Sequence, residues 1–312
     1  MLDFLKKVFS PATFNETLRA ATPVALAAAG GSMTEHAGIM NIGMDGMILM
    51  GAFFGAYGSY LMGSGWLGLL LAMGVGILVG LLFGLFVVKL KADEFIIGCA
   101  INTFAVGLTG FLSDSIFGNE GAKGMPALPR VGIGPLADIP FVGKIFQGLP
   151  ILVYITVLLV VLLWLFVYKT PYGFWLRAAG EKPDTLRTAG ISPERMKWIA
   201  SLLCGILCSI AGAYLSLGDL SGNFAKNMAN SRGYIAFACV IFSAANPVKA
   251  YLAALMFGFF GALGTHLQSY ISSDLTAIIP YAITIIMMIY VVVRTQRKHR
   301  LAHKKPGKEK AA

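Results

Sequence analysis

The sequence predicts an all-α, polytopic bundle of transmembrane helices, with about 8–10 membrane segments that include short or re-entrant helices. Hydrophobic residues occupy 57% of the 312 positions and charged residues only 13%, whereas a typical soluble domain carries about 25% charged residues. Apolar runs of roughly 20 residues, the length that spans a bilayer, recur along the chain. The 37 glycines agree with this class, since glycine is commoner in transmembrane helices than in soluble ones. These observations exclude a soluble globular enzyme.

Nine apolar segments are the candidate membrane helices. They cover residues 14–33, 41–61, 67–89, 95–117, 150–168, 198–217, 233–245, 248–270 and 276–293. The segment 233–245 is short for a full span and ends at the turn signal Asn246-Pro247, so we expect a half-membrane or tilted helix there. Residues 1–293 therefore form one predicted membrane domain, and residues 294–312 form a basic tail with eight Lys or Arg.

The distribution of positive charge predicts which helix ends face the cytoplasm, because cytoplasmic loops of membrane proteins are rich in Lys and Arg. One arrangement places most basic groups on that side, namely Lys89, Lys91, the polar stretch 169–197, Lys249 and the tail 294–312. The C-terminus is then cytoplasmic, and the connections 118–149 and 218–232 lie outside. Nine full spans would place the N-terminus outside, whereas Lys6, Lys7 and Arg19 favour the inside. Either a re-entrant early segment or one more short element that crosses the membrane would resolve this conflict, and we favour the re-entrant segment.

A polar stretch interrupts the apolar pattern in the middle of the chain, at residues 169–197. It reads KTPYGFWLRAAGEKPDTLRTAGISPERMK and holds six Lys or Arg. Ser192 is a typical N-cap residue before a helix that starts at Pro193, and Gly180 and Gly190 are predicted helix ends. We expect a short helical element here that lies against the cytoplasmic surface of the membrane.

Glycines at every fourth position predict close packing between membrane helices. Gly76, Gly80 and Gly84 form one such stripe in the third segment, and Gly51 and Gly55 form another in the second. Small residues at this spacing let two helix backbones approach each other closely. The stripes therefore indicate a helix bundle, and they indicate nothing about its function.

Four polar or ionisable residues fall at or near membrane depth early in the chain, namely Glu35, His36, Asn41 and Asp45. Such groups usually face a bundle interior or a wet cavity. One interpretation is a broken helix that lines a translocation pathway, with Asn41 and Asp45 contributing to it. The other is a cytoplasmic turn at residues 34–38, followed by a helix whose start Asp45 stabilises through the helix dipole.

Three polar residues in later segments are weaker candidates. Asn102 and Thr103 either bind a polar solute or bridge two helices, and bridging is the commoner use of such residues. His266 is a lone histidine in an apolar helix. Catalysis by this histidine would need an orienting carboxylate, and Asp274 lies beyond the expected helix end. We therefore expect a structural role for His266.

The sequence lacks several motifs that mark nucleotide-binding, catalytic or metal sites. It contains no G-x-x-x-x-G-K-[ST] loop, so the chain does not bind ATP in that way, and it contains no nucleophile elbow and no H-E-x-x-H motif. The four cysteines lie in apolar runs without histidines at ligand spacing, which predicts no metal site. The net charge of +10 is explained by topology and by attraction of the basic tail to anionic membrane lipid, so no nucleic acid is expected. No cofactor is predicted, and energy must come from a partner or an ion gradient.

Three blocks of the sequence, in the right order, resemble ABC importer permeases of the simple-sugar and nucleoside branch, which includes the ribose and branched-chain amino acid permeases. They are ATPVALAAAGGSMTEHAGIMNIGMDGMILMGAFFG at 21–55, RAAGE through TAGI at 177–191, and RGYIAFACVIFSAANPVKAYLAALMFGFFG at 232–261. Asp45 replaces the usual Glu of the first block, which keeps the carboxylate, while His36 and Lys182 replace an Arg and an Asn. The Met-rich block 41–50 is most similar to permeases for purine or other nucleosides.

The resemblance implies a non-catalytic, multi-pass subunit of the bacterial plasma membrane. Such a subunit pairs with a second related permease, as a heterodimer, and is served by a cytoplasmic ABC ATPase and an extracellular substrate-binding lipoprotein. The second block corresponds to the contact with the ATPase, and the residues implied in that contact are Arg177, Gly180, Glu181, Ala189 and Gly190. Two other classes stay open, namely an ion- or proton-coupled secondary transporter that uses Asp45 and an intramembrane enzyme that uses His266.

Overall fold

The structure, a computed structural model, describes residues 10–118, 124–132 and 142–267. The predicted helix 276–293, the basic tail, Lys6, Lys7 and Asp274 lie outside these ranges. Within them the chain is almost entirely helical.

The long helices follow the predicted apolar segments closely, which confirms an all-α bundle. They are α2 (Pro11–His36), α3 (Met44–Met62), α4 (Gly65–Gly84) with its π-helical continuation η1 (Leu85–Lys89), α5 (Glu94–Phe117), α7 (Ile151–Lys169), α10 (Pro193–Ala213) with its π-helical continuation η4 (Tyr214–Asp219), α11 (Arg232–Ser243) and α12 (Pro247–Leu267). Five helices of the described ranges are long and apolar enough to cross a membrane. The helix predicted to be short, α11, has only 12 residues.

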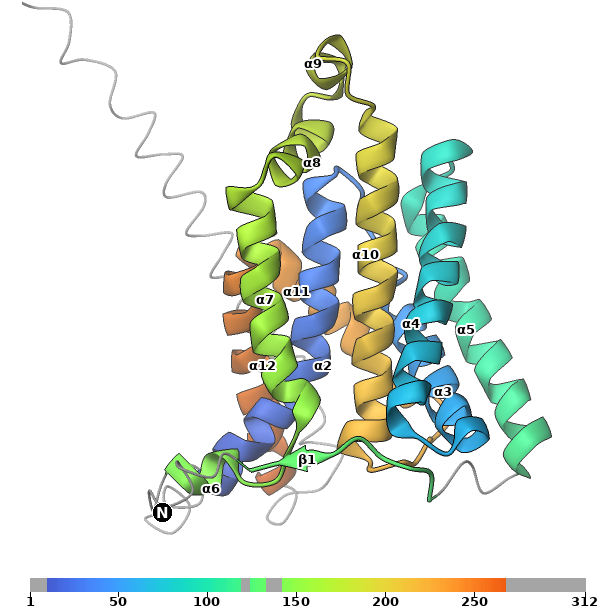
Figure 1. Ribbon diagram of the computed structural model, residues 1–312, viewed down its shortest axis with the longest axis vertical. Coiled ribbons are helices and arrows are strands. Elements are labelled where there is room, and N and C mark those ends of the chain that lie inside the picture. The colour runs from blue at the N-terminus through green and yellow to red at the C-terminus, as the bar shows by residue number, and fades with distance from the viewer. Residues whose placement is uncertain (1–9, 119–123, 133–141, 268–312) are drawn as a thin grey trace, which may run out of the picture.

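The shorter elements lie between the long helices. They are α6 (Val142–Phe146), α8 (Pro171–Glu181), α9 (Pro183–Thr188) and two strands, β1 (Arg130–Val131) and β2 (Leu149–Pro150), which pair antiparallel. Figure 1 shows α8 and α9 at one end of the bundle and β1 and α6 at the other. We call these the α8–α9 end and the β1–β2 end.

A hydroxyl or carboxylate side chain caps the first turn of four helices. Ser10, Thr170 and Ser192 each precede a proline and accept a hydrogen bond from a backbone N–H three residues on. Asp93 does the same for α5, where it accepts from the N–H groups of residues 95 and 96 at 3.0 Å. Proline fits the first helical position because it has no N–H to leave unpaired there. The N-cap predicted at Ser192 is thereby confirmed.

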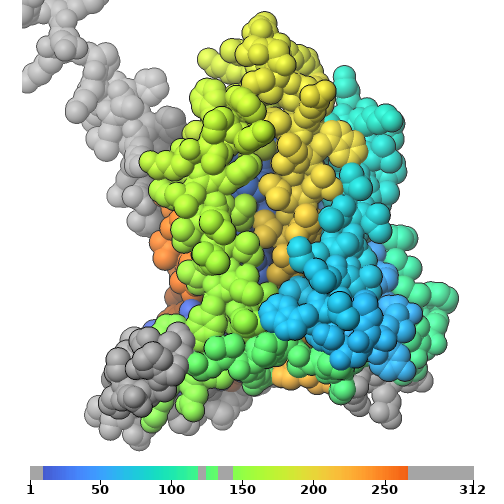
Figure 2. All heavy atoms as spheres, viewed as in Figure 1, coloured from blue at the N-terminus to red at the C-terminus, as the bar shows by residue number. Residues whose placement is uncertain are grey.

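The helix α10 is the centre of the bundle. Together with η4 it has 78% of its apolar window buried, against 39% or less for the other four long apolar helices. Figure 2 shows α10 in yellow between α7 in light green and α4 in cyan, with α2 in blue visible behind them. The helices that pack on α10 therefore need side chains that fit closely against its surface.

The predicted glycine stripes are the places where neighbours meet α10. A methyl group on Gly76 would lie 2.6 Å from the Oγ atom of Ser209, and one on Gly80 would lie 2.7 Å from the carbonyl oxygen of Ser201. Gly51 of α3 lies against the backbone of Ser209 in the same way. Contacts this close are possible only because glycine has no side chain. The prediction of close packing is confirmed.

Two predictions need correction. Gly180 does not end a helix, because α8 continues through it to Glu181. Gly190 does follow the end of a helix, with φ of +79° in the left-handed region that favours glycine. The early re-entrant segment is not seen within the described ranges, since α2 begins at the β1–β2 end and runs to the α8–α9 end (Figure 1). Arg19 lies near the beginning of α2 and is therefore at the end opposite to the polar stretch 169–197.

Candidate functional site

The chain between α2 and α3 is a break at residues 37–43. It begins with a turn at Gly38, whose φ of +71° lies in the left-handed region. It then runs back into the bundle, where the side-chain oxygen of Asn41 accepts a hydrogen bond from the N–H of Gly43 at 2.9 Å. Asn41 is 2% exposed, and its amide nitrogen lies 3.3 Å from the sulfur of Cys204. A turn is thus followed by a break inside the bundle, and the role of Asn41 and Asp45 in a translocation pathway stays a prediction.

The N-termini of two helices, α3 and α11, meet below this break. Asp45 lies in the first turn of α3, and its Oδ1 atom accepts a hydrogen bond from the N–H of Gly233 at 2.8 Å, in the first turn of α11. Gly233 lies directly against the backbone of Asp45, so that no side chain fits between the two helices. A carboxylate is favourable here because the N-terminus of a helix carries partial positive charge. Asp45 therefore ties α11 to α3.

Asn102 of α5 binds the same junction with three hydrogen bonds. Its Oδ1 atom accepts from the N–H of Gly46 at 2.7 Å, and its Nδ2 atom donates to the carbonyl of Ile42 at 3.1 Å and to the hydroxyl of Tyr234 at 3.0 Å. Asn102 lies eight residues after the first residue of α5, which places it about 12 Å along the helix axis. The junction is therefore well inside the bundle.

Thr103 does not join this group. It is exposed on another face of α5, and its hydroxyl donates to the carbonyl of Cys99 in its own helix at 3.0 Å. Three of the four residues predicted for the pathway, Asn41, Asp45 and Asn102, thus converge within the bundle, and Thr103 points elsewhere.

The connection between η4 and α11, residues 220–231, was expected to stay outside and does not. It leaves the β1–β2 end beside Asp219 and reaches Asp45 and Asn102, where α11 begins. On the way it lies along α5, with Lys226 in an ion pair with Asp114. Sequence reasoning missed its side chains because a polar, irregular segment near the end of a helix resembles an external loop. The one available signal was the shortness of α11, which implied that the chain enters the bundle without a helix.

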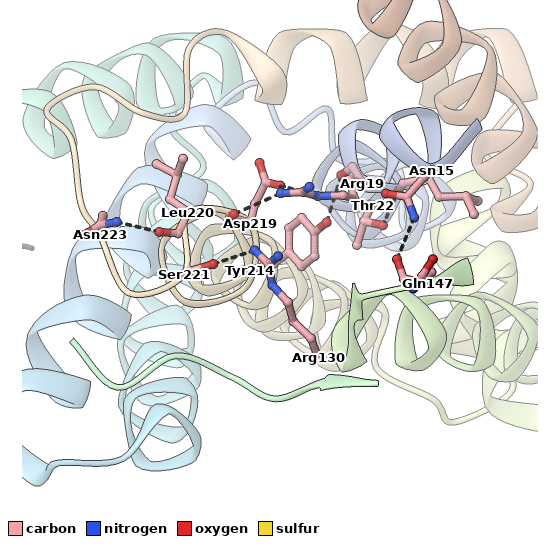
Figure 3. Close-up of polar contacts among 11 residues, drawn as sticks. Asn15, Arg19, Thr22, Arg130, Gln147, Tyr214, Asp219, Leu220, Ser221 and Asn223 are labelled. Atoms are coloured by element: carbon pink, nitrogen blue, oxygen red, sulfur yellow. Dashed lines mark hydrogen bonds and ion pairs between the residues drawn. The ribbon is translucent and has the colours of Figure 1, made fainter. Parts of the chain in front are cut away.

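Polar contacts at the β1–β2 end connect elements that are distant in sequence, as Figure 3 shows. Arg19 of α2 binds Asp219 at the end of η4 through two nitrogens, at 2.8 and 3.0 Å. The hydroxyl of Tyr214 donates to the backbone carbonyl of Arg19 at 3.1 Å, and Arg130 of β1 donates to Ser221 at 2.6 Å. The ends of α2 and α10 and the start of the connection to α11 are therefore held together.

At the α8–α9 end, a cavity of about 360 Å³ opens between α8, α9 and the turn that follows them. Three of the five residues implied in the ATPase contact line it, namely Arg177, Glu181 and Ala189. Two aromatic side chains of α8, Tyr172 and Phe174, are 55% and 62% exposed. Large exposed aromatic groups outside a membrane-spanning helix are typical of a protein–protein contact.

Gly180 and Gly190 do not line this cavity. Gly180 lies on the inner side of α8, where a methyl group would be 2.7 Å from the backbone nitrogen of Gly38. The helix α8 thus rests directly on the break between α2 and α3. Next to it, the guanidinium of Arg177 lies 5.2 Å from the ring of Tyr168, at the end of α7.

A second cavity at this end, of about 480 Å³, lies between α9, the beginning of α10 and the turn before α5. Its charged side chains are mixed in sign, namely Lys91, Asp93, Glu94, Arg187, Glu194 and Lys197. Arg187 forms an ion pair with Glu194, and the hydrogen bond and the charge of that carboxylate raise the pKa of Arg187 above its usual value. This contact fixes α9 on the first turn of α10. The described residues hold no group of three or more His, Cys, Asp or Glu that would bind a metal ion.

Comparison with known proteins identifies a family. A sequence profile described as "Branched-chain amino acid transport system / permease component" matches residues 13–290. The guanosine ABC transporter permease protein NupQ of Bacillus subtilis is 34% identical over 254 residues, which cover 78% of each chain. The nucleoside ABC transporter permease protein NupC of Lactococcus lactis is 31% identical over 284 residues, 86% of this chain and 88% of that protein.

A third relative carries a different substrate name. The putative glucose ABC transporter permease protein TsgC13 of Haloferax volcanii is 28% identical over 310 residues, 92% of this chain and 94% of that protein. No solved structure matches this chain. The profile spans most of the sequence, and the helix bundle agrees with it. The chain belongs to the branched-chain amino acid transport system permease family, and it is the non-catalytic, multi-pass membrane subunit of an ABC importer of the sugar and nucleoside branch.

Proposed function

We propose that this chain forms one half of the membrane pathway of an ATP-driven nucleoside importer, with purine nucleosides among its substrates. The names of two relatives, a guanosine permease and a nucleoside permease, support this substrate class. The name of a third relative supports a simple sugar as the second candidate. The other half is a second, related permease subunit in a heterodimer.

Family membership removes the two other classes that the sequence left open. A permease of this family takes its energy from ATP hydrolysed by a separate subunit, receives its substrate from a binding protein and uses no cofactor of its own. Asp45 is therefore not needed as an ion or proton site, and its bond to Gly233 gives it a structural role. An enzymatic role for His266 has no support, and its side chain lies outside the described residues.

The substrate proposal is tested by transport in proteoliposomes that contain the full complex of both permeases, the ATPase and the binding protein. Uptake of radiolabelled guanosine is expected only when ATP is enclosed with the ATPase, and unlabelled adenosine is expected to compete at least tenfold better than ribose or glucose. Better competition by glucose would replace the nucleoside proposal with the sugar one. Uptake driven by an ion gradient without ATP would contradict both.

The contact with the ATPase lies, on this proposal, at the surface of α8 and α9. The observation that carries it is a polar element that exposes two aromatic side chains, Tyr172 and Phe174, and holds a cavity whose lining includes Phe174, Arg177 and Glu181. One face of α8 is fixed to the bundle through the buried Leu176, which leaves the other face for a partner. This end is then cytoplasmic, together with the C-terminus, and the binding lipoprotein docks at the β1–β2 end.

Coupling follows from the contacts of this element. Closure of the ATPase dimer moves α8 and α9, and Gly180 transmits the movement to the break that begins at Gly38. The same movement reaches α10 through the ion pair between Arg187 and Glu194. Both routes lead to the bundle interior, so ATP binding shifts the equilibrium between inward-open and outward-open states.

Reversing the charge of Glu181 tests this docking surface. The variant Glu181→Arg is expected to abolish transport and association with the ATPase and to leave membrane insertion intact, because an acidic group of the cavity becomes basic. Co-purification of the ATPase with a tagged permease measures the association.

The matched control is Asp184→Arg, which makes the same change of charge three residues away. Asp184 is 93% exposed, does not line the cavity and has only a 3.6 Å ion pair with Arg187. Exposed ion pairs contribute about 0–1 kcal/mol, so this variant is expected to keep the ATPase. If Glu181→Arg retains the ATPase as well as the control does, the docking surface lies elsewhere.

A further inference from the structure

The irregular segment before α11 penetrates the bundle from the β1–β2 end. Its last residues lie beside Asn102, which is fifteen residues from the final residue of α5 at that end. Fifteen helical residues correspond to about 22 Å. Backbone without regular structure is tolerated at membrane depth only where protein covers it or water reaches it. The exposed side chains of residues 220–231 therefore indicate whether lipid or water lies against this segment.

Several side chains of this segment are exposed and polar. They are Ser221, Lys226, Asn227 and Asn230, followed by Tyr234 in the first turn of α11. Tyr234 is 44% exposed although its hydroxyl accepts a hydrogen bond from Asn102. Asparagine amides facing lipid would leave both donors and acceptors unpaired, which is costly in hydrocarbon. This face of the subunit does not contact lipid.

Other faces of the bundle have the composition that lipid requires. The exposed residues of α4 include Leu70 and Leu78, and those of α7 include Leu158 and Leu162. Figure 2 shows the side of the molecule on which α4 and α7 lie. The exposed surface of α4 and α7 is thus mainly aliphatic, whereas that of residues 221–230 is largely polar.

The charged groups near the polar face already have partners. Lys226 forms an ion pair with Asp114, Arg232 donates a hydrogen bond to the backbone carbonyl of Met228 at 2.9 Å, and Asp45 accepts one from the backbone N–H of Gly233. Within residues 226–234, the exposed uncharged side chains are the ring of Tyr234 and the amides of Asn227 and Asn230. A zwitterionic amino acid or an anion needs charged partners, whereas an uncharged aromatic solute with hydroxyl groups needs a ring and hydrogen-bonding groups.

We propose that residues 226–234 line the water-filled translocation pathway and that Tyr234 is the platform on which the base of a nucleoside stacks during passage. This inference rests on the proposed nucleoside transport and assigns it a contact residue. Asn102 positions Tyr234 through its hydroxyl, while Asn227 and Asn230 bind the ribose hydroxyls. Aromatic side chains stack with every nucleobase because each base has a π face.

Cysteine labelling tests the pathway without reference to the substrate. In the full complex, Asn227→Cys and Asn230→Cys are compared with Leu78→Cys and Leu162→Cys, all in a Cys99→Ser background, since the other three cysteines are buried. A charged, membrane-impermeant methanethiosulfonate reagent is added to the side where the binding protein docks. The two asparagine positions are expected to react at least tenfold faster than the two leucine positions. Equal rates would overturn the pathway, whatever the substrate is.

A pair of variants at Tyr234 tests the stacking. Tyr234→Ala is expected to lower guanosine uptake at least tenfold, and Tyr234→Phe, which keeps the ring and loses the bond to Asn102, is expected to lower it less than threefold. Both variants are checked for unchanged membrane levels and unchanged co-purification of the ATPase. Equal losses in the two variants would overturn the stacking role. If the alanine variant does not fold, Tyr234→Leu replaces it, because leucine fills similar space without a π face.

Discussion

Replacing Gly76 by valine is expected to prevent the bundle from assembling, whereas the same replacement at Gly74 leaves it intact. The two glycines belong to α4 and are two residues apart. A methyl group on Gly76 would lie 2.5 Å from the carbonyl oxygen of Gly205 and 2.6 Å from the Oγ atom of Ser209, and one on Gly74 would have no neighbour within 4 Å. The atoms in the way at Gly76 are partly backbone atoms of α10, which cannot rotate aside.

The expected loss at Gly76 is large because α10 is the most buried of the five long apolar helices and α4 rests on it along several turns. Overpacking costs about 1–3 kcal/mol where side chains can adjust, and here two helices must separate and lose contacts along their length. Size-exclusion chromatography in mild detergent measures assembly, with a single sharp peak for Gly74→Val and aggregation for Gly76→Val. A sharp peak for both variants would contradict the packing described above.

The second large effect is expected at Asn102, with its sequence neighbour Thr103 as the control. Asn102→Leu removes three hydrogen bonds and leaves the N–H of Gly46 and the carbonyl of Ile42 without their partner. Each buried polar group left unpaired costs about 1–3 kcal/mol. Thr103→Leu changes only an exposed hydroxyl that binds its own helix, so it is expected to cost less than about 1 kcal/mol.

Thermal unfolding of the purified complex and guanosine uptake measure the difference between the two variants. We expect Asn102→Leu to lower the midpoint of unfolding by several degrees and to reduce uptake strongly, since the starts of both α3 and α11 lose their anchor. Thr103→Leu is expected to remain near the parent protein in both measurements. A reversed order would contradict the anchoring role of Asn102.

The helices were predictable because a helix that spans a bilayer needs about 20 consecutive apolar residues, and such runs can be recognised in the sequence. The predicted ends of α5, and of α4 taken together with η1, differ from the observed ends by no more than two residues, and the short helix α11 was expected from the Asn246-Pro247 turn. The stripe at Gly76 was predictable because its spacing matches one helix face. Gly180 was assigned wrongly because helix ends and close backbone contacts both favour glycine, and only the position of Gly38 distinguishes them.

The candidate site was only partly predictable. Asn102 and Thr103 are adjacent polar residues in an apolar helix, and no pattern around them shows which one faces the interior. Tyr234 was not found, because a tyrosine at the start of a membrane helix is the usual residue at a membrane surface. Its depth depends on the irregular segment before it, and that depth is fixed by Asp45 and Gly233, which are 188 positions apart. Contacts of this range leave no local trace in a sequence.

The central helix α10 also determines how far a movement is carried. Its first turn is capped by Ser192, directly after α9, and with η4 it continues to Asp219, which is bound to Arg19 at the other end. These 27 residues form a rod about 40 Å long. Hydrogen bonds along its axis resist stretching, so an axial displacement at Ser192 arrives at Asp219 almost undiminished. One continuous helix thus connects the end proposed to contact the ATPase with the end proposed to receive the substrate.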